Sequence, residues 1–322
     1  MSKPISKPIV TVFGATGAQG GGLARALLSD PGRHFAVRAV TRKPDSTAAR
    51  DLREAGAEIV LADIDDGCSV RRALEGAYGA FFVTNFWEHL SGEKEESQAQ
   101  NLAGAAAQAG IRHAIWSTLE DTRRFFPADG RRMPVLERRY NVPHFDAKGA
   151  ANEFFARHRV PTTYLYTSCY LENLIHFGMG PQRAADGSLA ITFPIAEARI
   201  PWVAAGDIGL AAAEIFLRGD ALIGDSIGIA GDQLTGAELA AALSLALGET
   251  VTFDAVEPDA FRALGFDGAD EMGNMWQFKR DFAAEFCGRR DLARARALHP
   301  GMLTVAAWLA ANKARLPVAR AA

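Results

Sequence analysis

The stretch VFGATGAQG, residues 12–20, places three glycines at intervals of three residues. An apolar run over 8–13 leads into the first glycine, and an Ala- and Leu-rich stretch over 21–28 follows the last. This order predicts a strand, a tight turn and a helix at the start of a βαβ unit. A glycine-rich turn can also form without a ligand, so the motif depends on this context for its meaning.

The three glycines have separate roles in a dinucleotide-binding turn. Gly14 permits the sharp change from strand to helix, Gly17 lets a pyrophosphate approach the backbone, and Gly20 lets the helix pack closely on the strand. The start of the helix then presents N–H groups and the positive end of the helix dipole to the phosphates. We therefore expect a dinucleotide to bind at this turn.

Beyond the turn, strand-like apolar runs alternate with helix-like stretches as far as residue 166. This alternation predicts an α/β fold with a doubly wound parallel Rossmann sheet, whose strands end at one ligand-binding edge. After residue 170 the pattern predicts a smaller α+β C-terminal lobe. We expect domains at 1–166 and 167–322, with part of 200–232 rejoining the sheet.

The expected elements follow from periodicity and from turn residues. Thr235 and Glu238 form a capping box, which indicates the start of one C-terminal helix. Strands are expected over 8–13, 35–40, 58–61, 80–84, 113–116 and 162–166, and helices over 21–28, 46–55, 68–74, 93–109, 145–157, 206–217, 234–247 and 304–314.

The composition is that of an ordinary globular protein, with 48% hydrophobic and 23% charged residues and a net charge of −3. This charge favours neither nucleic acid nor an anionic membrane as a partner. The cysteines, Cys68, Cys169 and Cys287, form no CxxC pair, so neither a disulfide framework nor a metal site is expected. No apolar stretch approaches the roughly 18 residues of a membrane helix. We expect a cytoplasmic protein, and the sequence leaves open whether it forms a homodimer.

The end of the second expected strand, VTRK over 40–43, indicates which dinucleotide binds. A protein that binds NAD usually carries a carboxylate here for the ribose 2′-hydroxyl, and one that binds NADP carries a basic residue for the 2′-phosphate. Arg42 can direct two N–H donors at that phosphate, and Lys43 adds a point charge. The sequence favours NADP(H), although solvated surface cations would give the same pattern.

Candidate catalytic residues lie after the fifth strand. Short-chain dehydrogenases use Tyr-x-x-x-Lys, and here Lys148 stands at the lysine position with His144 four residues before it. If Pro143 is the first helical residue, both side chains share one helix face. His144 can serve as an acid near neutral pH, although packing at the helix start is the favoured interpretation. Ser117 and Thr118 can bind substrate or cofactor, or cap the strand end.

Residues 121–143 interrupt the alternation with six arginines and two adjacent phenylalanines, Phe125 and Phe126. Loops of this length in compact domains are commonly lids or binding loops. We hypothesise a mobile flap that becomes ordered over the nicotinamide end, or contacts a partner, when NADP(H) binds. A solvated loop with paired charges is the alternative.

The chain resembles the NmrA-like family of atypical short-chain dehydrogenase/reductases over nearly its whole length. The resemblance rests on VFGATGAQG (12–20), VRAVTRKP (37–44), FVTNFWE (82–88), HFDAKGAANEFF (144–155), VPTTYLYTSCYLENL (160–174) and GDIG (206–209). Such proteins often lack the catalytic tyrosine and are interpreted as NADPH/NADP redox sensors that change partner binding with cofactor state. Other relatives that share only the lysine are reductases.

The resemblance implies a role for each matching position. The pyrophosphate would bind at Gly14, Thr16, Gly17, Ala18, Gln19 and Gly20, and the adenosine phosphate at Thr41, Arg42 and Lys43. Asp63 would lie beside the adenine, and Thr84, Asn85 and Phe86 under the cofactor. Lys148 would hold the nicotinamide ribose, and Tyr170, Leu171, Glu172 and Asn173 would cover the nicotinamide.

Two functions fit these residues. The first is a redox sensor or regulator, because His-x-x-x-Lys replaces Tyr-x-x-x-Lys. The second is an NADPH-dependent reductase of a small carbonyl, quinone or imine that uses Lys148. Aromatic residues that could line its apolar pocket, or simply pack in the core, are Phe86, Trp87, Tyr170 and Trp276. The sequence favours the sensor and names neither the substrate nor a protein partner.

Overall fold

The computed structural model describes residues 7–126, 132–184 and 186–318. Its contacts divide the chain into two compact units. The first unit comprises Met1–Glu120, Ala147–Tyr166 and Gly206–Ile227. The second comprises Asp121–Asp146, Thr167–Ala205 and Gly228–Ala322. Each unit is therefore assembled from segments that are not contiguous in sequence.

A seven-stranded sheet forms the centre of the first unit, in the order β11-β6-β5-β4-β1-β2-β3. All neighbouring pairs from β6 to β3 are parallel. The doubly wound α/β fold expected from the sequence is thereby confirmed. The strands are β1 (Ile9–Val12), β2 (Ala36–Thr41), β3 (Glu58–Leu61), β4 (Gly79–Phe82), β5 (His113–Thr118), β6 (Thr162–Tyr166) and β11 (Ser226–Gly228).

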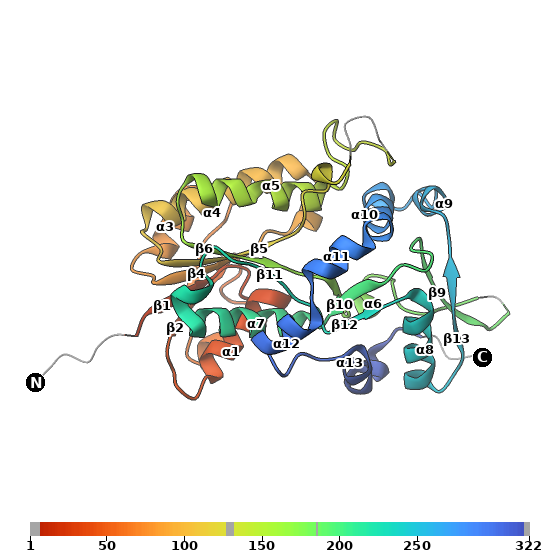
Figure 1. Ribbon diagram of the computed structural model, residues 1–322. Helices are drawn as coiled ribbons and strands as arrows, with labels where there is room; N and C mark the ends of the chain where they lie inside the picture. Colours follow the sequence, from red (N-terminus) through yellow and green to blue (C-terminus); the bar gives the residue numbers. More distant parts are fainter. Residues whose placement is uncertain (1–6, 127–131, 185, 319–322) are drawn as a thin grey trace, which may run out of the picture. The chain divides into compact units, whose positions relative to one another are not determined.

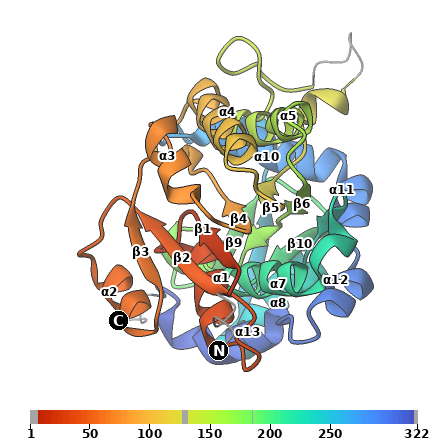
Figure 2. The same ribbon diagram turned by 90° about the vertical axis from the view of Figure 1, so that its left-hand side faces the viewer.

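Helices cover both faces of this sheet (Figures 1 and 2). One face carries α3 (Gly67–Leu74), α4 (Gly92–Gln108) and α5 (Pro143–Arg157), and the other carries α1 (Ala18–Ser29) and α7 (Ala205–Arg218). The remaining helical segments of this unit are α2 (Thr47–Glu54), η1 (Phe86–Glu88) and η3 (Gly219–Leu222). Phe155 of α5 packs against two buried strand residues, Phe82 at 5.7 Å and Trp116 at 5.3 Å between ring centroids.

Several boundaries differ from those expected. Helix α1 begins at Ala18 rather than at Gly21, so it includes Ala18, Gln19 and Gly20, which the sequence placed in the turn. Strand β5 extends through Thr118 and is buried throughout. Helix α5 begins at Pro143 rather than at Phe145, so the condition under which His144 and Lys148 lie on one helix is met. Proline suits this position, because its fixed φ matches a helix start and its missing N–H costs nothing there.

The second unit is an α+β assembly with two three-stranded sheets, β12-β10-β7 and β13-β9-β8. Its strands are β7 (Cys169–Tyr170), β8 (Gln182–Arg183), β9 (Leu189–Phe193), β10 (Ile200–Val203), β12 (Asp232–Leu234) and β13 (Val251–Ala255). Its helices are η2 (Thr122–Arg124), α6 (Asn173–His176), α8 (Gly236–Leu247), α9 (Pro258–Arg262), α10 (Ala269–Asp281), α11 (Ala283–Arg289), α12 (Leu292–Leu298), α13 (Val305–Asn312) and η4 (Lys313–Arg315). The capping box at the start of α8 is present as expected.

The described parts of the 121–143 insertion are anchored within the second unit. The buried Asp146 carboxylate accepts hydrogen bonds from the backbone N–H groups of Thr122, Asn141 and Val142, and from the Thr122 hydroxyl. Burial raises the pKa of Asp146 to about 6, against the opposing effect of these donors. The expected flap also includes residues 127–131, which lie outside the described residues.

Candidate functional site

The glycine turn joins β1 to α1, and its three glycines are not equally required by the fold. Gly14 has a positive φ of +64°. A Cβ on Gly20 would lie 2.5 Å from the Gly14 carbonyl oxygen, which no real structure tolerates. A Cβ on Gly17 would lie 3.3 Å from that same oxygen, which is a tight contact but not an overlap, so the fold constrains this position less than it constrains Gly20.

The start of α1 has the properties of an anion-binding site. Gly17 caps the helix and has no side chain to accept its first N–H groups. Gly17 is exposed, as are Thr16 and Ala18. The Gln19 side-chain oxygen accepts a hydrogen bond from the Ser117 hydroxyl at 2.8 Å, which links the turn to the end of β5. A pyrophosphate fits this turn, because Gly17 leaves the backbone open to it.

The end of β2 presents the expected cation, but the structure gives it an acidic partner. Arg42 Nη2 donates to both carboxylate oxygens of Glu88, at 2.7 and 2.8 Å. Burial alone would raise the pKa of Glu88, but the hydrogen bond and charge of Arg42 outweigh it and the pKa is lowered. Thr41 Oγ1 accepts from the backbone N–H of Lys43 at 3.0 Å, which turns the chain at the strand end.

The loop after β3 is ordered by its own polar groups. The Asp63 carboxylate accepts from the N–H of Asp65 at 3.0 Å, and Ser69 Oγ donates to the Asp63 carbonyl at 2.8 Å. Asp63 is half-buried, so it stays accessible at the carboxyl edge of the sheet. Its expected place beside an adenine stays a prediction.

Lys148 lies in a buried polar cluster of the first unit. Its Nζ donates to Thr84 Oγ1 at 2.6 Å and to the Thr84 carbonyl at 3.0 Å, and forms an ion pair with Glu95 at 2.8 Å. Thr84 Oγ1 in turn donates to Glu95 at 2.7 Å. Glu95 lies on α4 and is 0% exposed. The cluster thus fixes the ammonium group, which also lies 5.5 Å from the centre of the Trp116 ring.

Thr118 has a structural role. Its hydroxyl lies 3.0 Å from the Lys148 carbonyl and 2.8 Å from Asn152 Oδ1, and Thr118 is fully buried. Asn152 also donates to the Tyr166 hydroxyl at 3.0 Å. These contacts hold α5, and so Lys148, against β5 and β6. The sequence left two roles open for Thr118, binding substrate or cofactor and capping the strand end. These contacts fit the second role.

His144 lies in the first turn of α5, in the part of that helix that belongs to the second unit, and it pairs with a carboxylate of the same unit. Its backbone N–H donates to Glu271 Oε1 at 3.0 Å, and its Nδ1 is hydrogen-bonded to the same oxygen. Both side chains are buried, at 8% and 6% exposure. A carboxylate accepts only, so Nδ1 carries the proton in this bond. Glu271 therefore fixes both the ring and its tautomer.

The segment expected to cover the nicotinamide is held by Glu172. Its carboxylate accepts from the backbone N–H of Ala205 at 2.8 Å and from the Trp308 indole at 3.2 Å. Tyr170 and Asn173 are half-buried on either side of it. Both oxygens of Glu172 thus have partners within the second unit, and they position the segment.

The aromatic residues divide between core and surface. Phe86 and Trp276 are buried, at 3% and 0% exposure, whereas Trp87 is 46% exposed. Asn85 is exposed and precedes η1, which begins with Phe86. Trp276 packs on Phe193 at 5.0 Å, so core packing accounts for it. Trp87 is the aromatic residue of this group most accessible to a ligand.

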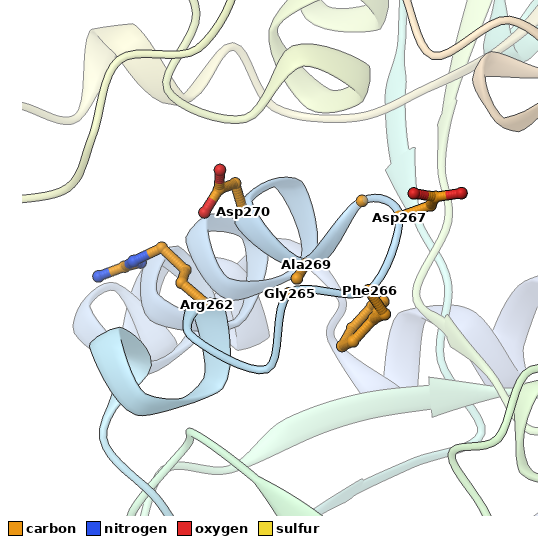
Figure 3. Close-up of a pocket in the computed structure, with 7 residues that line it drawn as sticks. Arg262, Gly265, Phe266, Asp267, Ala269 and Asp270 are labelled. Atoms are coloured by element: carbon orange, nitrogen blue, oxygen red, sulfur yellow. The ribbon is translucent and has the colours of Figure 1, made fainter.

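A shallow depression of about 270 Å³ lies at the junction of α9 and α10 (Figure 3). The labelled side chains that line it, including Phe266 and Asp270, point in different directions rather than toward one centre. The Arg262 guanidinium donates to Asp259 at 2.7 Å and to Asn274 at 2.9 Å. The depression therefore lacks convergent polar groups of the kind that orient a ligand.

Comparison with known proteins identifies the family. The NmrA-like family model matches residues 6–309. The chain belongs to the NmrA-like family.

A curated relative, the NmrA-like family domain-containing oxidoreductase FrzB of Cladobotryum sp., is 35% identical over 182 residues, which are 54% of this chain and 50% of the relative. The chain thus spans about half the length of this relative. NmrA itself, a negative transcriptional regulator, has a solved structure that matches with a TM-score of 0.76 at 23% identity, covering 95% of each chain. The Citrobacter sp. triphenylmethane reductase complexed with NADP(H) matches with a TM-score of 0.73 at 18% identity, covering 97% of this chain and 100% of that one. These two likenesses show the fold alone.

Two features are not found in the described part of this NmrA-like chain, a membrane-spanning helix and a metal-binding cluster. No helix among residues 7–126, 132–184 and 186–318 is long and apolar enough to cross a membrane. In the same ranges, no group of three His, Cys, Asp or Glu side chains could hold a metal ion.

Three carboxylates at the candidate site were missed from the sequence. Glu88, Glu95 and Glu271 contact Arg42, Lys148 and His144 respectively. Glu88 and Glu95 were detectable in principle, because they lie next to expected strand ends and helix starts. Glu271 carries no such signal, since it lies 127 residues from His144.

Proposed function

We propose that the chain is an NADP(H)-dependent oxidoreductase that reduces a small carbonyl, quinone or imine. The observation that carries the proposal is the His144–Glu271 pair, which supplies a positioned acid on the helix that carries Lys148. His144 would then supply the proton that the tyrosine supplies in the Tyr-x-x-x-Lys arrangement. The name oxidoreductase of the FrzB relative supports the same class of reaction.

The proton would come from His144. Glu271 holds the Nδ1 proton, so the imidazolium form would release its proton from Nε2. The carboxylate stabilises the cationic ring before transfer and keeps the ring in place afterwards. The bound cofactor supplies the hydride, and one proton from His144 completes the two-electron reduction of a carbonyl to an alcohol.

Lys148 would position the nicotinamide ribose. Its three N–H groups point at Thr84 and Glu95, and the longest of these hydrogen bonds is the 3.0 Å contact with the Thr84 carbonyl. A ribose hydroxyl can replace that contact while the ion pair with Glu95 persists. Glu95 and Thr84 are then positioning residues, which keep the ammonium group pointed at one place.

Arg42 and Lys43 support NADP(H) rather than NAD(H) as the cofactor. Both are exposed at the end of β2, and Nη2 is the Arg42 nitrogen that contacts Glu88. The other N–H groups of the guanidinium can therefore donate to a phosphate. Together with the exposed Gly17, they give the first unit groups that could bind the pyrophosphate and the 2′-phosphate.

The test is NADPH oxidation at 340 nm against panels of carbonyls, quinones and imines, with NADPH affinity measured separately by calorimetry. We expect turnover that depends on Lys148 and His144. Tight NADPH binding without turnover on any panel would contradict the reductase and favour the redox sensor that the missing tyrosine suggests. Failure to bind NADPH would reject both.

A further inference from the structure

A thiol and an amine that the proposed reaction does not use meet inside the second unit. Cys169 on β7 and Lys279 on α10 lie 110 residues apart in sequence, with Lys279 Nζ 2.9 Å from Cys169 Sγ. Both are buried, at 6% exposure for Cys169 and 3% for Lys279. An amine in hydrogen-bond contact with a buried sulfur is an unusual use of lysine, which is rarely buried in proteins.

Aromatic rings hold the lysine side chain in this position. Its Nζ lies 4.6 Å from the centre of the Trp276 ring, 5.5 Å from Phe145 and 5.7 Å from Phe286. Trp276 and Phe286 are themselves almost fully buried. The amine therefore has few alternative rotamers, and the sulfur–nitrogen contact is preorganised.

We propose that Cys169 and Lys279 form a covalent modification site that responds to hydrogen peroxide. In the first step the thiol attacks the peroxide, so Cys169–SH and H₂O₂ give Cys169–SOH and water. In the second step the Lys279 amine attacks the sulfenic sulfur, the S–O bond breaks, and hydroxide leaves with a proton from nitrogen as water. The product is a sulfenamide, Cys169–S–NH–Lys279, and the sulfur has been oxidised by two electrons.

The geometry favours this outcome over further oxidation. The amine is already in contact with the sulfur, whereas a second peroxide must reach it by diffusion, as the first one does. A thiol of another molecule is larger than peroxide, so the burial of Cys169 hinders it more, which protects the sulfenic acid until the amine captures it. Water competes poorly with a nucleophile that is held at the reacting atom.

The other cysteines provide internal comparisons. Cys68 is exposed on α3, and nothing confines its oxidation to one product. Cys287 is half-buried with its Sγ 3.3 Å from the Arg199 carbonyl, and burial raises the pKa of its thiol. Cys169 is thus the cysteine for which the described residues place an amine at the sulfur.

The cross-link would join β7 to α10. Strand β7 ends at Tyr170, and α10 carries Glu271, the partner of His144. Peroxide would therefore covalently fix two segments of the second unit that contain candidate site residues. The inference does not depend on NADP(H) binding or on turnover, because the chemistry needs only the two side chains and peroxide.

The experiment uses the full-length chain with Cys68→Ser and Cys287→Ser, so that Cys169 is its only cysteine. Peroxide-treated and dithiothreitol-treated samples are compared by isotope-resolved peptide mass spectrometry. We expect a peptide pair that joins the segments around residues 169 and 279, lighter by about 2 Da than the sum of the reduced peptides and separated again by dithiothreitol.

Lys279→Arg is the matched control, because it keeps N–H donors on a long side chain but is a poor nucleophile. In this variant we expect Cys169 to gain about 16 Da or more without a cross-link. The protein that retains Lys279 decides the question even if the Lys279→Arg variant folds poorly. The proposal is overturned if Cys169 of the protein that retains Lys279 stays reduced, or gains oxygen without joining Lys279.

Discussion

Lys148 and His144 lie one turn apart on α5, yet the protein holds them in different ways. Lys148 contacts Thr84 and Glu95, which come from a strand end and a helix of its own sheet. His144 contacts one oxygen of Glu271, which lies 127 residues later. The lysine is thus placed by the Rossmann fold, whereas the histidine depends on one long-range contact. Under the proposed function, the contacts of the Rossmann fold would hold the cofactor anchor, and the long-range contact would hold the acid.

The largest effect is expected from removing the acid. His144→Gln should lower kcat by about 100- to 10,000-fold, because positioned acid catalysis contributes this much. NADPH affinity should stay close to that of the unchanged protein, since the variant keeps Lys148 and the glycine turn. Steady-state kinetics and calorimetry measure the two quantities. His158→Gln, an exposed histidine just after α5, is the control that should change neither. An equal kcat in His144→Gln and His158→Gln would show that His144 is not the acid.

Lys148→Met should lower the stability of the protein as well as its NADPH affinity, because it removes the proposed ribose contact and leaves the fully buried Glu95 carboxylate without its cation. Breaking a buried ion pair by removing one partner costs about 3–5 kcal/mol. Denaturant unfolding of the single variant measures this loss. The double variant Lys148→Met/Glu95→Gln should recover much of the stability but not the NADPH affinity. A single variant as stable as the unchanged protein would show that the cluster does not hold the fold.

The two glycines of the turn separate structure from binding. Gly20→Ala should destabilise by about 1–3 kcal/mol, because its Cβ would overlap the Gly14 carbonyl. Gly17→Val should leave the melting temperature nearly unchanged and abolish NADPH binding, since the branched side chain occupies the place of the pyrophosphate. Thermal unfolding and calorimetry distinguish them. Tight NADPH binding by Gly17→Val would mean that the turn is purely structural.

A smaller effect is expected at the Arg42–Glu88 pair. Glu88→Gln should tighten NADPH binding by a few-fold, because an exposed ion pair that competes for Arg42 is worth about 0.2–1 kcal/mol. NADH affinity should stay constant, since NADH lacks the 2′-phosphate. Glu93→Gln, an exposed carboxylate at the start of α4, serves as the comparison. Weaker NADPH binding in Glu88→Gln would show instead that Glu88 helps to orient Arg42.

What could be predicted from sequence follows the same division between local and long-range contacts. The strand-turn-helix order around Gly14 and the capping box at Thr235 depend on neighbouring residues, and both are confirmed. The start of α5 at Pro143 is local in the same way, and the sequence offered it as a possibility beside the expected start at Phe145. The partner of His144 could not be predicted, because no periodicity connects residue 144 to residue 271. Glu95 was missed for a different reason, since a glutamate in the first turn of a helix is ordinarily explained by the helix dipole.

The account claims that the chain transfers a hydride from NADPH to a small substrate. The most direct measurement supplies NADPH deuterated at the transferring C4 position, together with the best substrate from the panels, and determines the mass of the product. The account predicts a product that is heavier by about 1 Da, because the hydride comes from the cofactor. A chain that binds NADPH tightly while no product acquires the label would contradict it.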